Sequence, residues 1–235
     1  MREQFNRFLQ KVWPQRCLLC DSVCLHEIFL CHDCETTLPW QPPSCIRCAT
    51  KLPDHADFVL CTTCLMQTPP FHSTTALFQY EPPISQFILK LKFQSDLRIA
   101  QLFSHYWIDY LKKYRPIETL PACLMPVPLH HKRLSERGFN QALEIAKPIS
   151  RYFRIPIDIK SCVRIRHTEA QAMLPLKKRR NNLKNAFALS HVLPVKHVAI
   201  IDDVMTTSNT VSEISQLLTQ SGVEHIEVWC CARSA

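Results

Sequence analysis

Four Cys-x-x-Cys pairs stand in the first 64 residues, and their spacing is typical of metal binding. Ten or twelve residues separate the two pairs within each half. Two such pairs fill the tetrahedral coordination of one Zn2+, and a site closed by four thiolates is structural rather than catalytic. We therefore predict two structural zinc ions held by eight ligands: Cys17, Cys20, Cys31, Cys34, Cys45, Cys48, Cys61 and Cys64. Pairing in chain order is the simpler arrangement, and an interleaved one also fits the spacing.

A second group combines two adjacent carboxylates with a run of hydroxyl and amide side chains. Asp202 and Asp203 are followed closely by Thr206, Thr207, Ser208, Asn209 and Thr210. Carboxylates accept hydrogen bonds from neighbouring hydroxyls, and backbone N–H groups at a helix start suit a phosphate. The combination predicts a sugar-phosphate site. A receiver-type phosphoacceptor is excluded, because the 32 residues after Asp203 are too few to complete that fold.

A predicted strand precedes the two aspartates and a predicted helix follows the loop, and together these elements would position the carboxylates. The run Val198 to Ile201 is apolar and rich in β-branched residues, which predicts a strand buried on both faces. Apolar residues then recur at helical spacing up to Gly222, a plausible stop signal. Ligands of open α/β sheets bind at the carboxyl ends of the strands, where this order places the acids.

The rest of the chain predicts an α/β domain behind a small N-terminal one. Proline pairs at 69–70 and 82–83 indicate a domain boundary, which gives domains 1–70 and 71–235. In the first domain we expect an amphipathic helix ahead of the zinc ligands. Further strands and helices are expected, in chain order, at 74–80 (strand), 84–92 and 96–113 (helices), 122–127 (strand), 137–152 (helix kinked or split at Pro148) and 225–232 (strand). Strands that alternate with helices predict a parallel sheet flanked by helices.

Composition narrows the classes of function. No apolar run reaches the length of a membrane span and the N-terminus is charged, so we expect a cytoplasmic protein. In that reducing compartment, thirteen cysteines indicate metal binding rather than disulfide bonds. Only Gly138 and Gly222 are glycines, which excludes Walker A and dinucleotide-binding loops. Residues 121–191 hold fourteen Lys or Arg against four Asp or Glu, which indicates an anionic partner.

Several motifs carry a family resemblance. The stretch "AIIDDVMTTSNT" resembles the phosphoribosyl-pyrophosphate (PRPP) loop of type I phosphoribosyltransferases. The paired cysteines, "LKLKF" (89–93), "VPLHHKRLSERGFNQA" (127–142) and "TEAQAMLPLKKRRNNLKNAF" (168–187) resemble the ComF family of competence proteins. The resemblance implies a double zinc ribbon joined to a type I phosphoribosyltransferase-like domain, and a role with DNA taken up in natural transformation.

The resemblance also implies roles for individual residues. Asp202 and Asp203 would hold the ribose hydroxyls, and residues 206–210 would hold the 5′-phosphate. A pyrophosphate loop would face the diphosphate together with Mg2+. That loop comprises Val127, Pro128, Leu129, His130, Lys132 and Arg133. The peptide bond before Pro128 could be cis or trans. A lid or nucleic-acid contact is expected at Gln171, Lys177, Lys178, Arg179 and Arg180. Ser208 departs from the family, which usually has glycine there, and it would strain the loop if its φ is positive.

Two functions follow, and a third stays open. The first is a PRPP-binding protein that handles single-stranded DNA in competence, with other competence proteins as further partners. The second is an active phosphoribosyltransferase on a base or amine. The third is a zinc-ribbon scaffold whose transferase domain is inactive. The basic segment does not separate the first two, because diphosphate and DNA attract the same charge.

Overall fold

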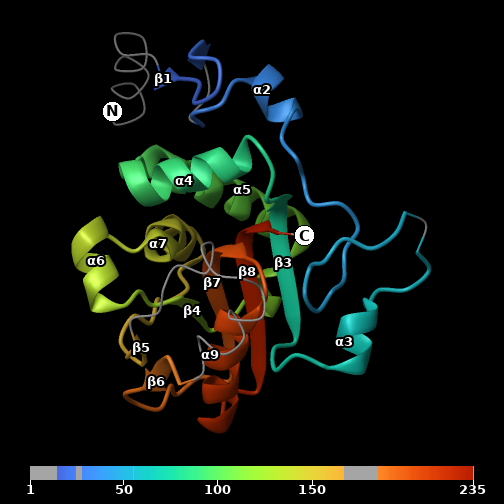
Figure 1. Cartoon of the computed structure of the whole chain (residues 1–235), viewed down its shortest axis with the longest axis vertical. Coiled ribbons are helices and arrows are strands. Elements are labelled where there is room, and N and C mark those ends of the chain that lie inside the picture. Colours follow the sequence, from blue (N-terminus) through green and yellow to red (C-terminus); the bar gives the residue numbers. More distant parts are fainter. Residues whose placement is uncertain (1–14, 25–27, 55, 167–184, 235) are drawn as a thin grey trace.

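A four-stranded parallel sheet forms the centre of the chain (Figure 1). The computed structural model describes residues 15–24, 28–54, 56–166 and 185–234. The strand order is β3-β8-β7-β4, and every neighbouring pair is parallel. The strands are β3 (Ser73–Gln79), β4 (Cys123–Pro126), β7 (His197–Met205) and β8 (His225–Arg233). The predicted parallel α/β sheet is thus confirmed.

The central strand β7 is buried on both faces, as its apolar run predicts. Residues 198–201 are all fully buried, and alternation sends Ile200 and Ile201 into hydrophobic clusters on opposite faces. The strand is longer than expected: it continues through both aspartates to Met205. Its pairing with β8 supports this extension, since Asp202 lies opposite Cys230 and Met205 opposite Arg233.

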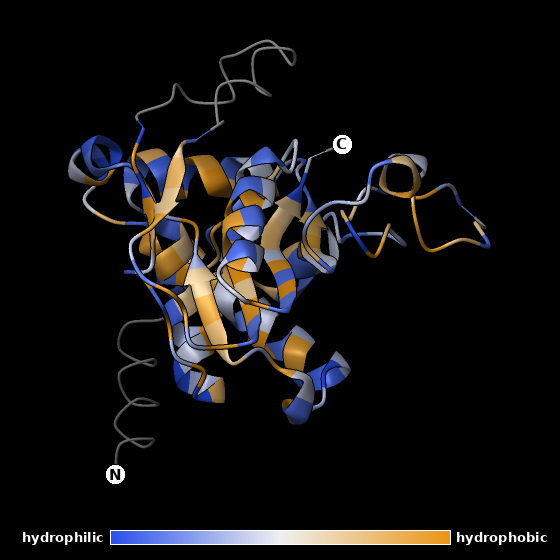
Figure 2. Cartoon of the chain, turned by 90° about the horizontal axis from the view of Figure 1, so that it is seen from below, coloured by the Kyte–Doolittle hydropathy of each residue, from blue (hydrophilic) through white to orange (hydrophobic). Residues whose placement is uncertain are grey.

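Helices cover both faces of the sheet (Figure 1). On one face lie α4 (Ile84–Gln94), α5 (Leu97–Tyr114) and α7 (Gln141–Phe153); on the other lies α9 (Asn209–Gln220). The Ser104 hydroxyl of α5 donates to the Ile145 carbonyl of α7 over 2.9 Å, and Trp107 stacks on Trp229 of β8. Figure 2 shows apolar residues along the strands and a mixed pattern on the helices, which is typical of amphipathic packing.

The region around Pro148 differs from expectation. Residues 131–137 form a short helix, α6 (His131–Arg137), which ends at Gly138 with φ 80°. The next helix, α7, starts at Gln141 because the Asn140 side chain accepts hydrogen bonds from the Ala142 and Leu143 N–H groups. Splitting at Pro148 was a wrong prediction: α7 continues to Phe153. Its buried face against α5 and the sheet offsets the one hydrogen bond that proline removes.

Smaller elements complete the described chain. A 3-10 helix, η1 (Ile117–Thr119), follows α5. An antiparallel pair, β5 (Cys162–Arg164) with β6 (Phe187–Leu189), lies where no regular structure was expected. These strands have three residues each, too short for a periodic signal in the sequence.

Two cysteine-rich units precede the sheet and pack against it. The first contains β1 (Gln15–Arg16), β2 (Val23–Cys24) and α2 (His32–Thr36), and the second contains α3 (Thr62–Met66). The segment between them lies along the edge strand β3: Gln41 N–H donates to the Leu77 carbonyl, and Gln79 N–H donates to the Pro39 carbonyl. Each unit adds buried side chains to one of the hydrophobic clusters, such as Leu38 to the first and Leu52 to the second.

Candidate functional site

The eight paired cysteines form two clusters in chain order. Within each cluster, all four Sγ atoms lie within 4.8 Å of one another: Cys17, Cys20, Cys31 and Cys34 in the first, and Cys45, Cys48, Cys61 and Cys64 in the second. The interleaved pairing is therefore wrong. In each unit the second pair opens a short helix, where spacing of three residues turns both thiols to one side. Four sulfur donors at this separation fit a structural Zn2+.

The side chains of Asp202 and Asp203 point to opposite faces of β7, because the two are adjacent residues of one strand. Asp203 is buried and forms an ion pair with Lys92 of α4, while Gln141 Nε2 of α7 donates to its Oδ1 over 3.3 Å. Asp202 is half-buried and lines a small pocket with the following loop. The sequence treated the acids as an equivalent pair, whereas the structure gives them different partners.

Electrostatics separates the two acids further. Burial and the neighbouring Asp203 carboxylate raise the pKa of Asp202 well above its usual range. Burial acts in the same direction on Asp203, but the Lys92 ammonium and the Gln141 amide outweigh it and lower the pKa of Asp203. The pair therefore holds its negative charge mainly on Asp203, and Asp202 takes up a proton more readily.

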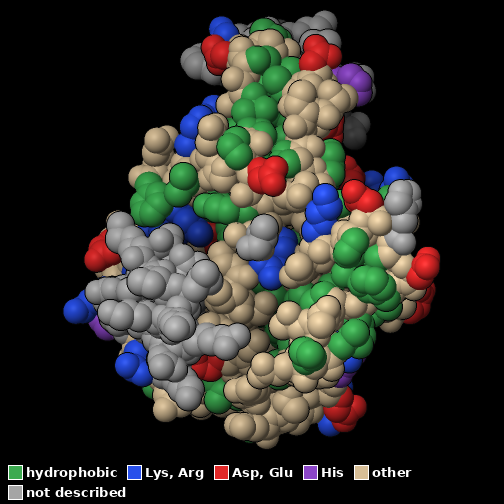
Figure 3. All heavy atoms as spheres, turned by 45° about the vertical axis from the view of Figure 1, so that its right-hand side comes forward, with side chains coloured by type: hydrophobic (Ala, Val, Ile, Leu, Met, Phe, Trp, Pro, Cys, Tyr) green, Lys and Arg blue, Asp and Glu red, His purple; other side chains and the backbone are tan. Residues whose placement is uncertain are grey.

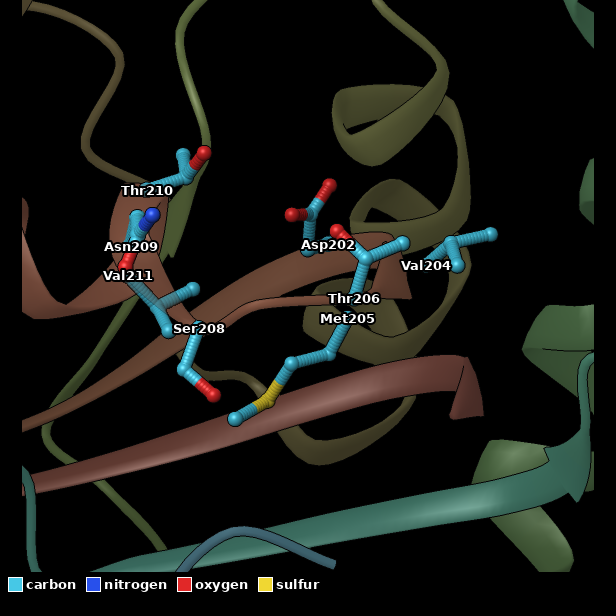
Figure 4. Close-up of a pocket in the computed structure, with 8 residues that line it drawn as sticks. All are labelled: Asp202, Val204, Met205, Thr206, Ser208, Asn209, Thr210 and Val211. Atoms are coloured by element: carbon cyan, nitrogen blue, oxygen red, sulfur yellow. The ribbon is translucent and has the colours of Figure 1, made fainter. Parts of the chain in front are cut away.

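The loop between β7 and α9 forms a polar pocket (Figure 4). In Figure 4, Asp202 and Thr206 lie on one side of it, and Asn209 and Thr210 lie on the other. Ser208 adopts φ 60° and ψ −3°, the left-handed conformation that the missing glycine would favour. The Thr207 hydroxyl is buried and has no hydrogen-bond partner among the described residues. Thr207 does not line this pocket, so the groups that the pocket offers to a phosphate are the N–H groups at the start of α9 and the hydroxyls of Thr206, Ser208 and Thr210.

A larger cavity of about 390 Å³ continues from this loop across the strand ends. It joins Asp202, Asp203, Thr206 and Thr210 to part of the predicted pyrophosphate loop, namely Val127, Leu129 and Arg133. His130 is instead buried at the start of α6, where its Nδ1 accepts a hydrogen bond from Lys132 N–H. The peptide bond before Pro128 is not among the cis bonds of the described chain.

Among the described residues, four cations line the cavity, and of these four the sequence predicted Arg133 there. Lys92, Arg137 and Arg164 come from α4, the end of α6 and β5. Burial lowers the pKa of Arg137 and of Arg164, so each guanidinium has lost part of its hydration. Partly dehydrated cations of this kind favour an anionic ligand. Lys92 and Arg137 do lie in the motifs "LKLKF" and "ERGFNQA", but nothing in the sequence singles out Arg164.

The cavity also has an apolar wall, which the sequence did not reveal. Tyr80, Leu89 and Phe93 line it, and the Arg137 guanidinium lies 5.8 Å from the centre of the Phe93 ring. The Phe93 side chain is 74% exposed, so it is available to a ligand. The predicted lid residues, Gln171 and 177–180, lie outside the described residues.

Comparisons with known proteins agree with this architecture. Residues 8–65 match the family model "Double zinc ribbon domain". Competence protein F of Haemophilus influenzae is 36% identical, with 93% of this chain and 97% of that protein aligned. The DNA utilization protein YhgH of Escherichia coli K12 is 34% identical, with 94% and 98% aligned. Competence protein ComFC of Streptococcus pneumoniae is 24% identical over 68% of each chain.

A structural comparison gives a weaker likeness. The crystal structure of purine phosphoribosyltransferase from Pyrococcus horikoshii Ot3 superposes with a TM-score of 0.33 at 17% identity, covering 57% of this chain and 71% of that one. This similarity is too low to support an inference.

The fold and the cysteine clusters define a class of protein in which a double zinc ribbon precedes an α/β domain built on a parallel sheet. Within that class the chain belongs to the competence protein F family, given its identity to these relatives over nearly their whole length. None of the described helices is long and apolar enough to cross a membrane.

Proposed function

We propose that this chain binds PRPP, or a closely related sugar phosphate, at the β7–α9 loop and handles single-stranded DNA in competence. The observation that carries the proposal is the continuous cavity that joins two carboxylates, a hydroxyl-rich loop and four cations. A phosphorylated ribose with a diphosphate needs these three kinds of partner at once. In this assignment the double zinc ribbon holds two structural Zn2+ ions.

Each part of the ligand has a partner in the cavity. The 5′-phosphate would lie against the N–H groups and hydroxyls of residues 206–210 that line the pocket. Asp202 and Asp203 would accept hydrogen bonds from the ribose hydroxyls. The diphosphate would extend toward Arg133, Arg137 and Arg164, and Mg2+ bound together with it would neutralise part of its charge.

The DNA part of the proposal is supported by the relatives' names and by the distribution of charge. Two of the aligned relatives are a competence protein and a DNA utilization protein. On the face shown in Figure 3, Lys and Arg side chains alternate with acidic and hydrophobic ones, whereas the cavity gathers four cations. We therefore assign the cations of the cavity to the diphosphate and propose the DNA contact at the basic run 177–180. Such a protein would act in the cytoplasm together with other competence proteins.

A salt-dependence experiment tests the DNA contact. Replacing Lys177, Lys178, Arg179 and Arg180 by Gln should weaken binding of single-stranded oligonucleotides of any sequence. The slope of log affinity against log salt should flatten by roughly 0.7 for each phosphate that the protein no longer neutralises. A collapse of PRPP binding with an unchanged salt slope would instead make the run a diphosphate lid and contradict the DNA contact.

The second candidate, an active transferase, is favoured by the apolar wall of the cavity. Tyr80, Leu89 and Phe93 offer a flat acceptor a surface beside the sugar site. Attack at C1 of the ribose would pass through an oxocarbenium-like state, stabilised by positioning and by the charges around the leaving diphosphate. Release of pyrophosphate from PRPP in a screen of bases and amines would establish this activity.

A further inference from the structure

A cluster of three histidines and one glutamate lies at the sheet edge opposite the cavity. His197 is the first residue of β7, His225 is the first residue of β8, and His72 directly precedes β3. Because the strands are parallel, their amino-terminal ends lie side by side and bring the three histidines together, whereas Asp202 and Asp203 lie near the carboxyl-terminal end of β7. The proposed PRPP site uses none of these side chains.

Strand register explains why the side chains converge. His197 and His225 are opposite each other in the β7–β8 pair, so their side chains lie next to each other on one face. Glu227 follows two residues after His225 and therefore points to the same face. The ligand atoms of His197, His225 and Glu227 all lie within 4.8 Å of one another.

The distances are short on the carboxylate side. Glu227 Oε1 is 2.9 Å from His197 Nε2 and 3.7 Å from His225 Nε2. The Glu227 side chain is only 4% exposed, and the two imidazoles are 24% and 46% exposed. The cluster is thus anchored in the core and open to solvent on its histidine side.

Other residues hold the carboxylate in place. Arg115, at the end of α5, donates from both Nη atoms to the two Glu227 oxygens at 2.9 Å each. Trp229 Nε1 donates to Oε2 over 2.8 Å, which leaves Oε1 facing the histidines. Hydrogen bonds of this kind, behind a ligating carboxylate, orient it for a metal.

The third histidine supports the others without being a ligand. His72 Nδ1 accepts a hydrogen bond from Ile226 N–H over 3.1 Å, so the proton of its neutral form sits on Nε2. The His72 ring packs against that of His225 with their centres 4.5 Å apart and their planes tilted by 31°. This contact limits rotation of the His225 ring.

We propose that His197, His225 and Glu227 form a third metal site, which takes a divalent transition metal through two nitrogens and one oxygen. The metal would replace the proton shared between His197 and Glu227 Oε1, and solvent would complete its coordination. Imidazole and carboxylate ligands suit Zn2+, Co2+, Ni2+ or Cu2+. We expect weaker binding than at the cysteine clusters, because the Arg115 guanidinium already neutralises part of the carboxylate charge.

Cobalt titration of the zinc-loaded protein tests this site. Protein with two equivalents of Zn2+ is titrated with Co2+ while visible absorption and bound metal are followed. One further equivalent should bind, with ligand-field bands of nitrogen and oxygen ligands and no thiolate-to-cobalt charge-transfer band. The variant with His197→Gln and His225→Gln should lose this equivalent and keep both zincs. His105→Gln, at an exposed histidine beside Asp109, is the matched control and should bind cobalt as the wild type does.

Two outcomes would overturn the proposal. One is the absence of a third equivalent in excess cobalt, or a signal only from thiolate-bound cobalt. The other is third-equivalent binding that survives in the double variant. Because neither substituted residue removes the Glu227–Arg115 pair, near-UV circular dichroism of the variant should match that of the wild type and rule out unfolding as the cause of a loss.

Discussion

Ser208 and the two aspartates are single residues on which the phosphate site depends. The sequence singled out Ser208 as an unusual residue, and its φ of 60° meets the condition for strain. The sequence also identified Asp202 and Asp203 as site residues, but it did not predict the ion pair between Asp203 and Lys92. Lys92 lies more than a hundred residues earlier in the chain, and only the packing of α4 against the sheet brings it near.

Replacing Ser208 by glycine should stabilise the loop. A left-handed conformation costs an ordinary residue roughly 1–2 kcal/mol, so Ser208→Gly should raise the free energy of unfolding by about 1 kcal/mol. PRPP affinity should rise by less than about tenfold, because the binding conformation becomes more populated. Arg154→Gly, at a left-handed residue closing α7, is the control: it should stabilise the fold without changing PRPP affinity. Unchanged stability and affinity in Ser208→Gly would show that serine fits without strain.

Lys92 should set the pH range in which the sugar site works. The ammonium lowers the pKa of Asp203, so Asp203 should stay ionised and keep its share of PRPP affinity until acid pH, after Asp202 has taken up its proton. In Lys92→Met the pKa of Asp203 rises toward that of Asp202, and the loss of affinity that follows protonation of Asp203 moves to higher pH. Lys90→Met, two residues earlier on α4, should leave the profile unchanged. Calorimetric titrations across pH measure the shift, and identical profiles for Lys92→Met and wild type would refute the role.

At the scale of elements, the sequence predicted those with a periodic apolar signal. The strands β3, β4 and β8 and the helices α4 and α5 were found close to their observed bounds, the start of β7 was found, and α9 was expected to end near Gly222. It missed α6, β5 and β6, which are short, and it stopped β7 before the aspartates, since acids are rare inside strands. The order of the strands in the sheet could not be predicted from the sequence, because β3 and β8 come from opposite ends of the domain and pair only in the folded sheet.

The ion pair between Arg115 and Glu227 should stabilise the contact of α5 with β8. Burial opposes ionisation of Glu227, but hydrogen bonds from His197, Arg115 and Trp229 outweigh it and lower its pKa to about 2. Glu227→Gln leaves the guanidinium without its partner and should cost on the order of 3 kcal/mol. Chemical denaturation measures this change.

The pH dependence follows from the sign of the Glu227 shift. A lowered folded-state pKa gives stability that is fully present above the unfolded value and is lost as pH falls from about 4.5 toward about 2. Glu227→Gln should lack this loss. Glu224→Gln is the control, since its pair with Lys196 is exposed and should contribute less than about 1 kcal/mol. Equal stabilities of the two variants would contradict a structural role for the pair.

At the scale of the whole molecule, the cysteine units share their cores with the sheet. The spacing of the pairs predicted both cysteine clusters, but it did not reveal that Leu38 and Leu52 join different hydrophobic clusters of the α/β domain. Nor did it predict the backbone hydrogen bonds that tie residues 39–41 to β3. Such contacts join distant segments and leave no local pattern. The division of the chain at residue 70 stays a prediction.

Loss of one zinc should therefore unfold one unit and loosen one side of the sheet. Cys17→Ser should leave about one Zn2+ by elemental analysis and expose amides of residues 15–41 to hydrogen exchange, with some loss of protection at the β3 edge. Cys61→Ser should do the same for residues 45–66. Cys24→Ala, at a buried cysteine outside both clusters, should keep two zincs. Two zincs in Cys17→Ser would contradict the assigned ligands.

The central claim, that the β7–α9 site binds PRPP, is tested most directly by calorimetric titration with Mg2+ and PRPP. The wild-type chain should bind one equivalent, and the variant with both Asp202→Asn and Asp203→Asn should show no binding while keeping its melting transition and two zincs. Asp109→Asn, at an exposed carboxylate on α5, should bind as the wild type does. Wild-type affinity in the double variant, or no binding to the wild-type chain, would contradict the account.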